Sequence, residues 1–285
     1  MNLRFIRKKI KTVGNVKKIT YAMQMVSAVK MKKSQALAQN GSLYRATLFE
    51  MLAGVANETL LRSFSLWTYK GKPTKTLKIV ITSNKGLCGN FNLSILKLLH
   101  SEVDYDTTDF IVLGKKGGNF LRKMGANIIA DFSSQIPFES NVSAIFELMK
   151  TKYLAGEYKK IDLYFNKFIS TSVFTTTIQT LLPLNFAPKE TPEDNKEASD
   201  YYLIEPSPEE ILSLLLEDVL QESIRGAILD STASEHSSRM LAMKQASDSA
   251  EEIVGDLTRL RNKFRQSAIT NELLDMTAAK LSITN

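Results

Sequence analysis

The sequence predicts an α/β protein in which long N- and C-terminal helices form an antiparallel coiled coil that brackets an open α/β sheet domain. Three observations predict this architecture. Residues 1–57 contain no proline and carry apolar residues three or four positions apart. Residues 209–285 also lack proline and show the same spacing. Between these segments, short β-branched runs alternate with helix-length stretches, which is typical of a sheet covered by helices.

The N-terminal segment, Leu3 to about Asn57, is expected to form one long helix with a weak point at Asn40–Gly41. At ~1.5 Å per residue it would be roughly 80 Å long, so part of it must protrude or pack on another long helix. The predicted inward-facing seam consists of Ile6, Ile10, Val13, Val16, Ile19, Met23, Val26 and Val29.

The C-terminal helix is expected to begin at Pro208 and to end near Leu281. Ser207 can cap it, and proline suits the first turn of a helix. Residues 226–250 are rich in Gly, Ala and Ser, which let two helix backbones approach closely or let a helix turn within a tight sleeve. The predicted seam beyond them consists of Ile253, Leu257, Leu260, Phe264, Ala268, Asn271, Leu274, Ala278 and Leu281.

The middle segment predicts the sheet. The expected strands are 77–82, 109–113, 127–130 and 161–165, with 173–182 as an added edge strand. The expected helices between them are 91–103, 117–124 and 141–154, and the polar residues 187–200 are expected to form a surface loop.

Composition and charge narrow the function. Of 285 residues, 44% are hydrophobic and 24% charged, which excludes a disordered or collagen-like chain. The net charge of +7 is uneven: eleven of the 37 bases lie in residues 1–49, which contain no acid, so the rest of the chain has a net charge of −4. Such a basic arm predicts a negative partner, which could be nucleic acid, a membrane surface or acidic protein loops.

Candidate chemistry is sparse, and the sequence predicts no catalytic, cofactor-binding or metal-binding residue. The glycine-containing loops 84–89 and 114–118 follow strands, but their spacing fits neither the Walker loop nor the dinucleotide fingerprint. Cys88, His100 and His236 form no recognisable catalytic or zinc-binding set. Two rivals stay open here: a nucleotide-dependent enzyme in the α/β domain, and a basic coiled coil that binds nucleic acid. The coiled-coil seam favours a protein-facing role.

Three stretches closely resemble the gamma subunits of F-type ATP synthases: KKITYAMQMVSAVKMKKSQ (17–35), SNKGLCGNFN (83–92) and SEHSSRMLAMKQASDSAEEIVGDLTRLRNKFRQSAITNELLD (234–275). The resemblance implies a non-catalytic rotor without a cofactor. One copy would penetrate a ring of three alpha and three beta subunits and would stand, with the epsilon subunit, on the membrane c ring. It would couple ion flow to ATP synthesis or hydrolysis, with no nucleic-acid partner.

The resemblance also implies a division of the chain and a set of contact residues. Residues 1–57 and 207–285 would be the coiled-coil helices, and 76–200 a Rossmann-like foot domain. The residues that match the family's contacts with the alpha–beta ring are Met23, Arg239, Arg265, Gln266, Thr270 and Glu272, and those of the foot, near the c ring and epsilon, are Tyr202 and Glu205. Ala278 stands where the family usually has glycine. The expected location is peripheral, on the cytoplasmic side of a bacterial plasma membrane, with a mitochondrial or plastid matrix as the alternative.

Overall fold

A computed structural model describes residues 3–55, 73–184, 205 and 207–283. Its elements, in chain order, are α1 (Leu3–Val55), β1 (Thr76–Ile81), α3 (Phe91–Glu102), β2 (Thr108–Leu113), α4 (Lys115–Lys123), β3 (Asn127–Asp131), η1 (Phe138–Asn141), α5 (Val142–Leu154), β4 (Lys160–Ser170), β5 (Val173–Leu182) and α6 (Pro208–Ile283). The predicted strands and helices are therefore confirmed. The α1 helix continues through Asn40–Gly41, where the sequence predicted a weak point. The expected loop at 187–200 lies outside the described residues.

The chain divides into two compact units. One consists of Met1–Ala28 and Arg239–Asn285, and the other of Val29–Ser238. Both α1 and α6 contribute to each unit, because each helix passes the point of division. The three-part division expected from the sequence follows the elements along the chain, and it stays a prediction.

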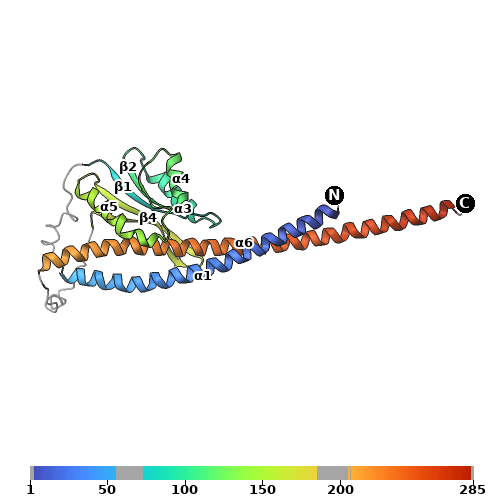
Figure 1. Cartoon of the computed structure of the whole chain (residues 1–285), viewed down its shortest axis with the longest axis horizontal. Coiled ribbons are helices and arrows are strands. Elements are labelled where there is room, and N and C mark those ends of the chain that lie inside the picture. The colour runs from blue at the N-terminus through green and yellow to red at the C-terminus, as the bar shows by residue number, and fades with distance from the viewer. Residues whose placement is uncertain (1–2, 56–72, 185–204, 206, 284–285) are drawn as a thin grey trace. The chain divides into compact units, whose positions relative to one another are not determined.

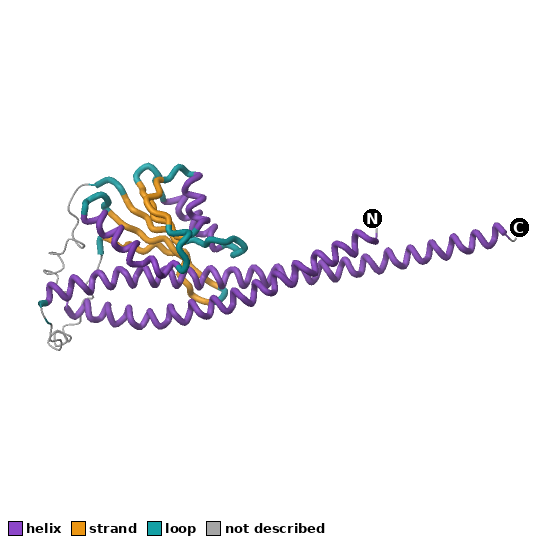
Figure 2. Tube along the Cα trace, viewed as in Figure 1, coloured by secondary structure: helices purple, strands orange, loops and turns teal. Residues whose placement is uncertain are grey.

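The second unit contains a five-stranded sheet with the order β3-β2-β1-β4-β5. Its strands are orange in Figure 2. Neighbouring strands are parallel except at the β4–β5 hairpin, which is antiparallel. The β1 strand pairs with β4 only as far as Tyr164, whereas the hairpin continues to Ser170. The outer half of the hairpin therefore extends beyond the rest of the sheet.

Each face of the sheet is covered by helices and has its own apolar core (Figure 1). On one face, strand residues pack against α5 and against Leu220, Ile224 and Ile228 of α6. On the other face, they pack against Ile95 and Leu99 of α3 and against α4. Burial on both faces explains why the inner strands carry large apolar residues on both sides of the sheet rather than on one side only.

Within the second unit, the end of α1 packs on the beginning of α6. Leu48 and Leu52 share a small core with Leu212, Leu216 and Val219. Nearby, a Cβ atom on Gly226 would lie 2.4 Å from Nη1 of Arg45, so glycine permits a close approach of the two helices here. The Ser207 hydroxyl accepts a hydrogen bond from the Glu210 amide at 3.3 Å, which confirms the predicted helix cap.

Candidate functional site

The first unit pairs the start of α1 with the second half of α6, and the two helices run antiparallel (Figure 1). The inward side of α1 keeps a three-and-four spacing. Its buried and half-buried residues include Ile6, Ile10, Val13, Lys17, Thr20, Gln24 and Ser27. Only the first three of these are apolar. Between Lys17 and Ser27 the inner face of α1 is mainly polar, and its most buried positions hold the small hydroxyl side chains Thr20 and Ser27.

Part of the predicted seam of α1 is therefore wrong. Val16, Ile19, Val26 and Val29 are 46%, 59%, 57% and 70% exposed. They lie mostly one position away from the residues that turn inward. Two neighbouring rows of residues along α1 could therefore have faced α6, and the row without these four residues does so. The inward-facing row contains hydroxyl groups that need no partner on α6, because Thr20 and Ser27 donate hydrogen bonds to carbonyls of α1 itself. Small side chains also allow the closer approach of two helices.

The facing side of α6 mixes polar and apolar residues. Its buried residues in this unit are Arg239, Met243, Ser247, Ala250 and Leu257. A salt bridge between Lys17 Nζ and Glu251 Oε1, at 2.8 Å, joins the two helices at the edge of this contact. Both side chains are partly exposed, so the pair contributes at most about 1 kcal/mol and mainly marks the antiparallel register. Leu257 is buried as predicted, but Ile253 is 46% exposed.

Beyond this contact, α6 continues past the start of α1 as a single helix (Figure 1). All residues from 265 to 278 are exposed. The predicted seam residues Ala268, Asn271, Leu274 and Ala278 therefore face no partner helix within the described chain, and the side chain of Leu281 lies outside it. Several large apolar side chains of this tail are open to solvent, namely Ile269 (49%), Leu273 (58%), Leu274 (60%) and Met276 (71%).

Four of the residues expected to contact a ring lie on this tail. Arg265, Gln266, Thr270 and Glu272 are all exposed, and the Thr270 hydroxyl donates to the Gln266 carbonyl at 3.0 Å. They follow one another over about two helical turns, so the structure places them on the same short stretch of helix.

The other expected contact residues are separate from that group. Met23 is half-buried on α1, and Arg239 is only 7% exposed on α6. Glu205 is exposed, just before α6, and Tyr202 lies outside the described residues. Sequence reasoning missed the polar inner face of the coil. The signal was Thr20, Ser27 and Ser34, small hydroxyl residues spaced seven apart and all buried.

The loops that could have held a phosphate are occupied by the chain itself. The first amides of α4 would be the natural anion site after β2. Instead, the Lys115 amide donates to Asn84 Oδ1 at 2.9 Å, the Lys116 amide to the Ser83 carbonyl at 3.1 Å, and the Gly117 amide to Thr82 Oγ1 at 2.9 Å. The glycines of this turn serve backbone packing, and the helix terminus offers these amides to no ligand.

The remaining titratable candidates do not form a reactive set. His100 is exposed on α3, His236 is half-buried on α6, and Cys88 is buried beside Asn92, whose Nδ2 lies 3.1 Å from the sulfur. Within the described ranges, no cluster of three or more His, Cys, Asp or Glu could hold a metal ion.

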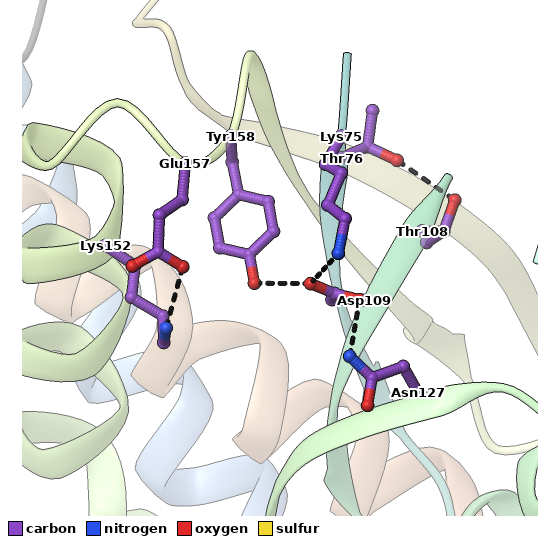
Figure 3. A network of polar contacts seen from close by, with 8 residues as sticks. All are labelled: Lys75, Thr76, Thr108, Asp109, Asn127, Lys152, Glu157 and Tyr158. Atoms are coloured by element: carbon purple, nitrogen blue, oxygen red, sulfur yellow. Dashed lines mark hydrogen bonds and ion pairs between the residues drawn. The ribbon is translucent and has the colours of Figure 1, made fainter. Parts of the chain in front are cut away.

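A buried acid of the sheet, Asp109, is held by a structural network at the amino-terminal ends of the strands (Figure 3). Asp109 accepts hydrogen bonds from Tyr158 Oη and Asn127 Nδ2, both at 2.8 Å, and from Lys75 Nζ at 3.4 Å. Burial alone raises the pKa of Asp109, but these donors and the Lys75 charge outweigh it, so the pKa lies below its ordinary value. Burial and the neighbouring carboxylate raise the pKa of Tyr158. The network joins β2, β3 and the segment before β4 around one charge.

Comparison with known proteins identifies the family. The family model described as ATP synthase matches residues 2–281. The ATP synthase gamma chain of Flavobacterium johnsoniae is 37% identical over 283 residues, covering 96% of each chain, and that of Akkermansia muciniphila is 33% identical, covering 98% of each.

Solved structures agree with this. A chain of the Tetrahymena thermophila mitochondrial ATP synthase central stalk and c ring is 26% identical with a TM-score of 0.58, and the match covers 80% of this chain and 99% of that one. A chain of the Euglena gracilis mitochondrial ATP synthase shares the fold, with a TM-score of 0.67 at 16% identity and coverage of 99% and 94%. By its sequence along nearly its whole length, the chain belongs to the ATP synthase gamma chain family.

Proposed function

We propose that this chain is the central rotor shaft of an F-type ATP synthase. It couples ion flow through a membrane c ring to ATP synthesis or hydrolysis at the catalytic beta subunits by rotation. The chain itself is a non-catalytic subunit, and the chemistry belongs to the complex.

The observation that carries the proposal is the two-helix coil of the first unit with its single-helix tail. A helix that exposes every residue from 265 to 278, including Leu274 and Met276, is suited to lie inside another protein. The basic residues of α1 add long-range attraction to acidic loops, which needs no fixed partner atom. Such tolerant contacts suit a part that meets three equivalent neighbours in turn.

Exposure supports four of the six proposed contacts with the alpha–beta ring. Arg265, Gln266, Thr270 and Glu272 offer exposed polar side chains on the tail. Met23 offers a half-buried thioether, a soft and adaptable contact. Arg239 belongs to the same proposed interface but presents only 7% of its surface.

At the other end, Tyr202 and Glu205 are proposed foot residues near the c ring and epsilon. The proposed assembly contains three alpha and three beta subunits, epsilon, the c ring and one copy of this chain, peripheral to the membrane on its cytoplasmic side. In the described part of the chain, every helix is too short or too polar to cross a bilayer.

Affinity purification from detergent-solubilised membranes tests the proposal. The tagged chain should elute with alpha, beta, epsilon and c subunits, and native mass spectrometry should give one copy of it to three alpha and three beta. An untagged chain in the same membranes is the control. Elution of the tagged chain alone, or with nucleic acid, would refute the proposal.

A further inference from the structure

In the second unit, α6 contacts the α/β domain in two successive ways. Its first half buries Leu220, Ile224, Ala227 and Ile228 in the core beneath the sheet. Apolar contact of this kind is strong but non-directional, so by itself it resists neither sliding nor rotation of the helix well. This half of α6 also makes two polar contacts with side chains of α5, a salt bridge between Lys150 Nζ and Glu217 Oε1 and a hydrogen bond between Ser143 Oγ and Gln221 Oε1. Hydrogen bonds to backbone carbonyls of the domain begin one to two turns beyond Ile228.

Three serine hydroxyls of α6 donate hydrogen bonds to backbone carbonyls of the α/β domain. Ser234 Oγ bonds to the Asn166 carbonyl at 3.2 Å, Ser238 Oγ to the Cys88 carbonyl at 2.6 Å, and Ser237 Oγ to the Thr171 carbonyl. The spacing of three and four residues places these serines on one side of the helix. We call Ser234, Ser237 and Ser238 the serine triad.

The accepting carbonyls belong to three different parts of the domain. Asn166 is in β4, Thr171 lies in the turn of the β4–β5 hairpin, and Cys88 lies in the loop between β1 and α3. Backbone carbonyls cannot rotate away as side chains can. Three separate points of attachment on the side of a helix fix its position along its axis and its rotation about that axis.

Asn166, whose carbonyl accepts the hydrogen bond from Ser234, is itself bonded to other elements of the domain. Its side chain is fully buried, and Nδ2 donates to the Phe91 carbonyl at 2.8 Å, at the start of α3. Its Oδ1 accepts from Thr176 Oγ1 of β5, also at 2.8 Å. Ser234 is thereby linked through one residue to α3, β4 and β5.

We propose that the residues of the serine triad are positioning residues that prevent α6 from rotating about its own axis relative to the α/β domain. Torque applied to the domain then passes along α6 into the coil. This inference rests on the proposed rotor function. Each hydrogen bond contributes only about 1 kcal/mol to stability, so the triad is a small part of the folding free energy. Its effect is to stiffen the attachment of α6 to the α/β domain, which we call the joint, against rotation about the helix axis.

The chain provides a matched control in Ser231. It lies on the same helix, one turn before Ser234, and is 1% exposed, but its hydroxyl has no hydrogen-bond partner. The Ser231→Ala variant removes a buried hydroxyl from α6 without removing a link to the domain. It should therefore leave the stiffness of the joint unchanged.

The experiment measures angular fluctuation in the assembled complex. The ring is fixed to a surface, a bead is attached to a cysteine introduced at the exposed Lys123 of α4, and the variance of the bead angle is recorded with the catalytic sites stalled. The variant with Ser234, Ser237 and Ser238 all changed to Ala should raise the variance about twofold, because contacts of about 1 kcal/mol each exceed the thermal energy. Ser231→Ala should give the wild-type variance.

Two outcomes would overturn the inference. One is an unchanged variance in the triple variant, even if its melting temperature falls, since that is what purely structural serines would give. The other is an equal rise in Ser231→Ala. If the triple variant does not assemble, Ser238→Ala is compared with Ser238→Thr, which retains the hydroxyl: only the alanine variant should raise the variance. Failure of the wild-type chain to rotate in a ring would count against the rotor function instead.

Discussion

Truncation of the tail after Phe264 should impair the function of the chain in its complex while leaving the stability of the isolated chain nearly unchanged. The structure gives the expected magnitude. The removed helix, 265–283, is about 28 Å long, at ~1.5 Å per residue. Because its residues 265–278 are all exposed, their removal takes no side chain out of a core, and the free energy of unfolding should change by less than about 0.5 kcal/mol.

The control is Leu257→Ala, on the same helix but inside the coil. Leu257 is 8% exposed, and its truncation should cost about 2–3 kcal/mol. Thermal unfolding followed by circular dichroism measures both variants. In the assembled complex, the tail truncation should lower the torque and the ATP yield per transported ion, whereas the isolated chain unfolds as wild type. A fall in melting temperature comparable to that of Leu257→Ala would refute the assignment of the tail as a partner-facing element.

Three further predictions concern the coil and the sheet. Ser27→Leu should destabilise the chain by about 1–3 kcal/mol through overpacking, although a simple apolar-seam rule predicts a gain; Val26→Leu, at an exposed position, should be neutral in the same denaturant titration. Gly114→Ala should cost more than about 2 kcal/mol in thermal unfolding, because φ is +107° and the new Cβ would lie 2.0 Å from the Thr82 carbonyl oxygen; a wild-type melting temperature would contradict this. Asp109→Asn should be less stable than wild type at neutral pH. Because the native pKa of Asp109 is depressed, the carboxylate's contribution is complete above its ordinary value of 3.8 and is lost as the pH falls through the native pKa. The two unfolding curves should therefore converge below that value, and a constant difference down to acidic pH would exclude this role.

The fold was largely predictable because its signals are local. Short β-branched runs separated by helix-length segments give the order of strands and helices, and Ser207 caps α6 as its residue type predicts. These features depend on the backbone preferences of short segments, which the sequence contains in full.

The inner face of the coil was not predictable in the same way. Val16 and Ile19 fit an apolar seam as well as any residues do, yet Lys17 and Thr20 turn inward. The choice depends on how closely the partner helix approaches, and the small residues of α6 set that distance. The exposed tail was not predictable from spacing either: Leu274 continues the spacing of Leu257, but it is 60% exposed and no described part of α1 packs on it.

Of the candidate contact residues, the structure could place those on the tail and in the coil, whereas their proposed partners are other chains. The serine triad was hidden for another reason. A run of small residues was visible in the sequence, but hydroxyls bonded to carbonyls 66 to 150 residues away leave no local pattern.

The central claim is that this chain turns inside a ring, and rotation of the assembled complex tests it most directly. The ring is fixed to a surface, and a bead on the α/β domain is watched while ATP is supplied. The account predicts rotation in one direction with pauses at three equally spaced angles, one for each beta subunit. ATP hydrolysis by a complete ring while the bead stays fixed or fluctuates without direction would contradict it.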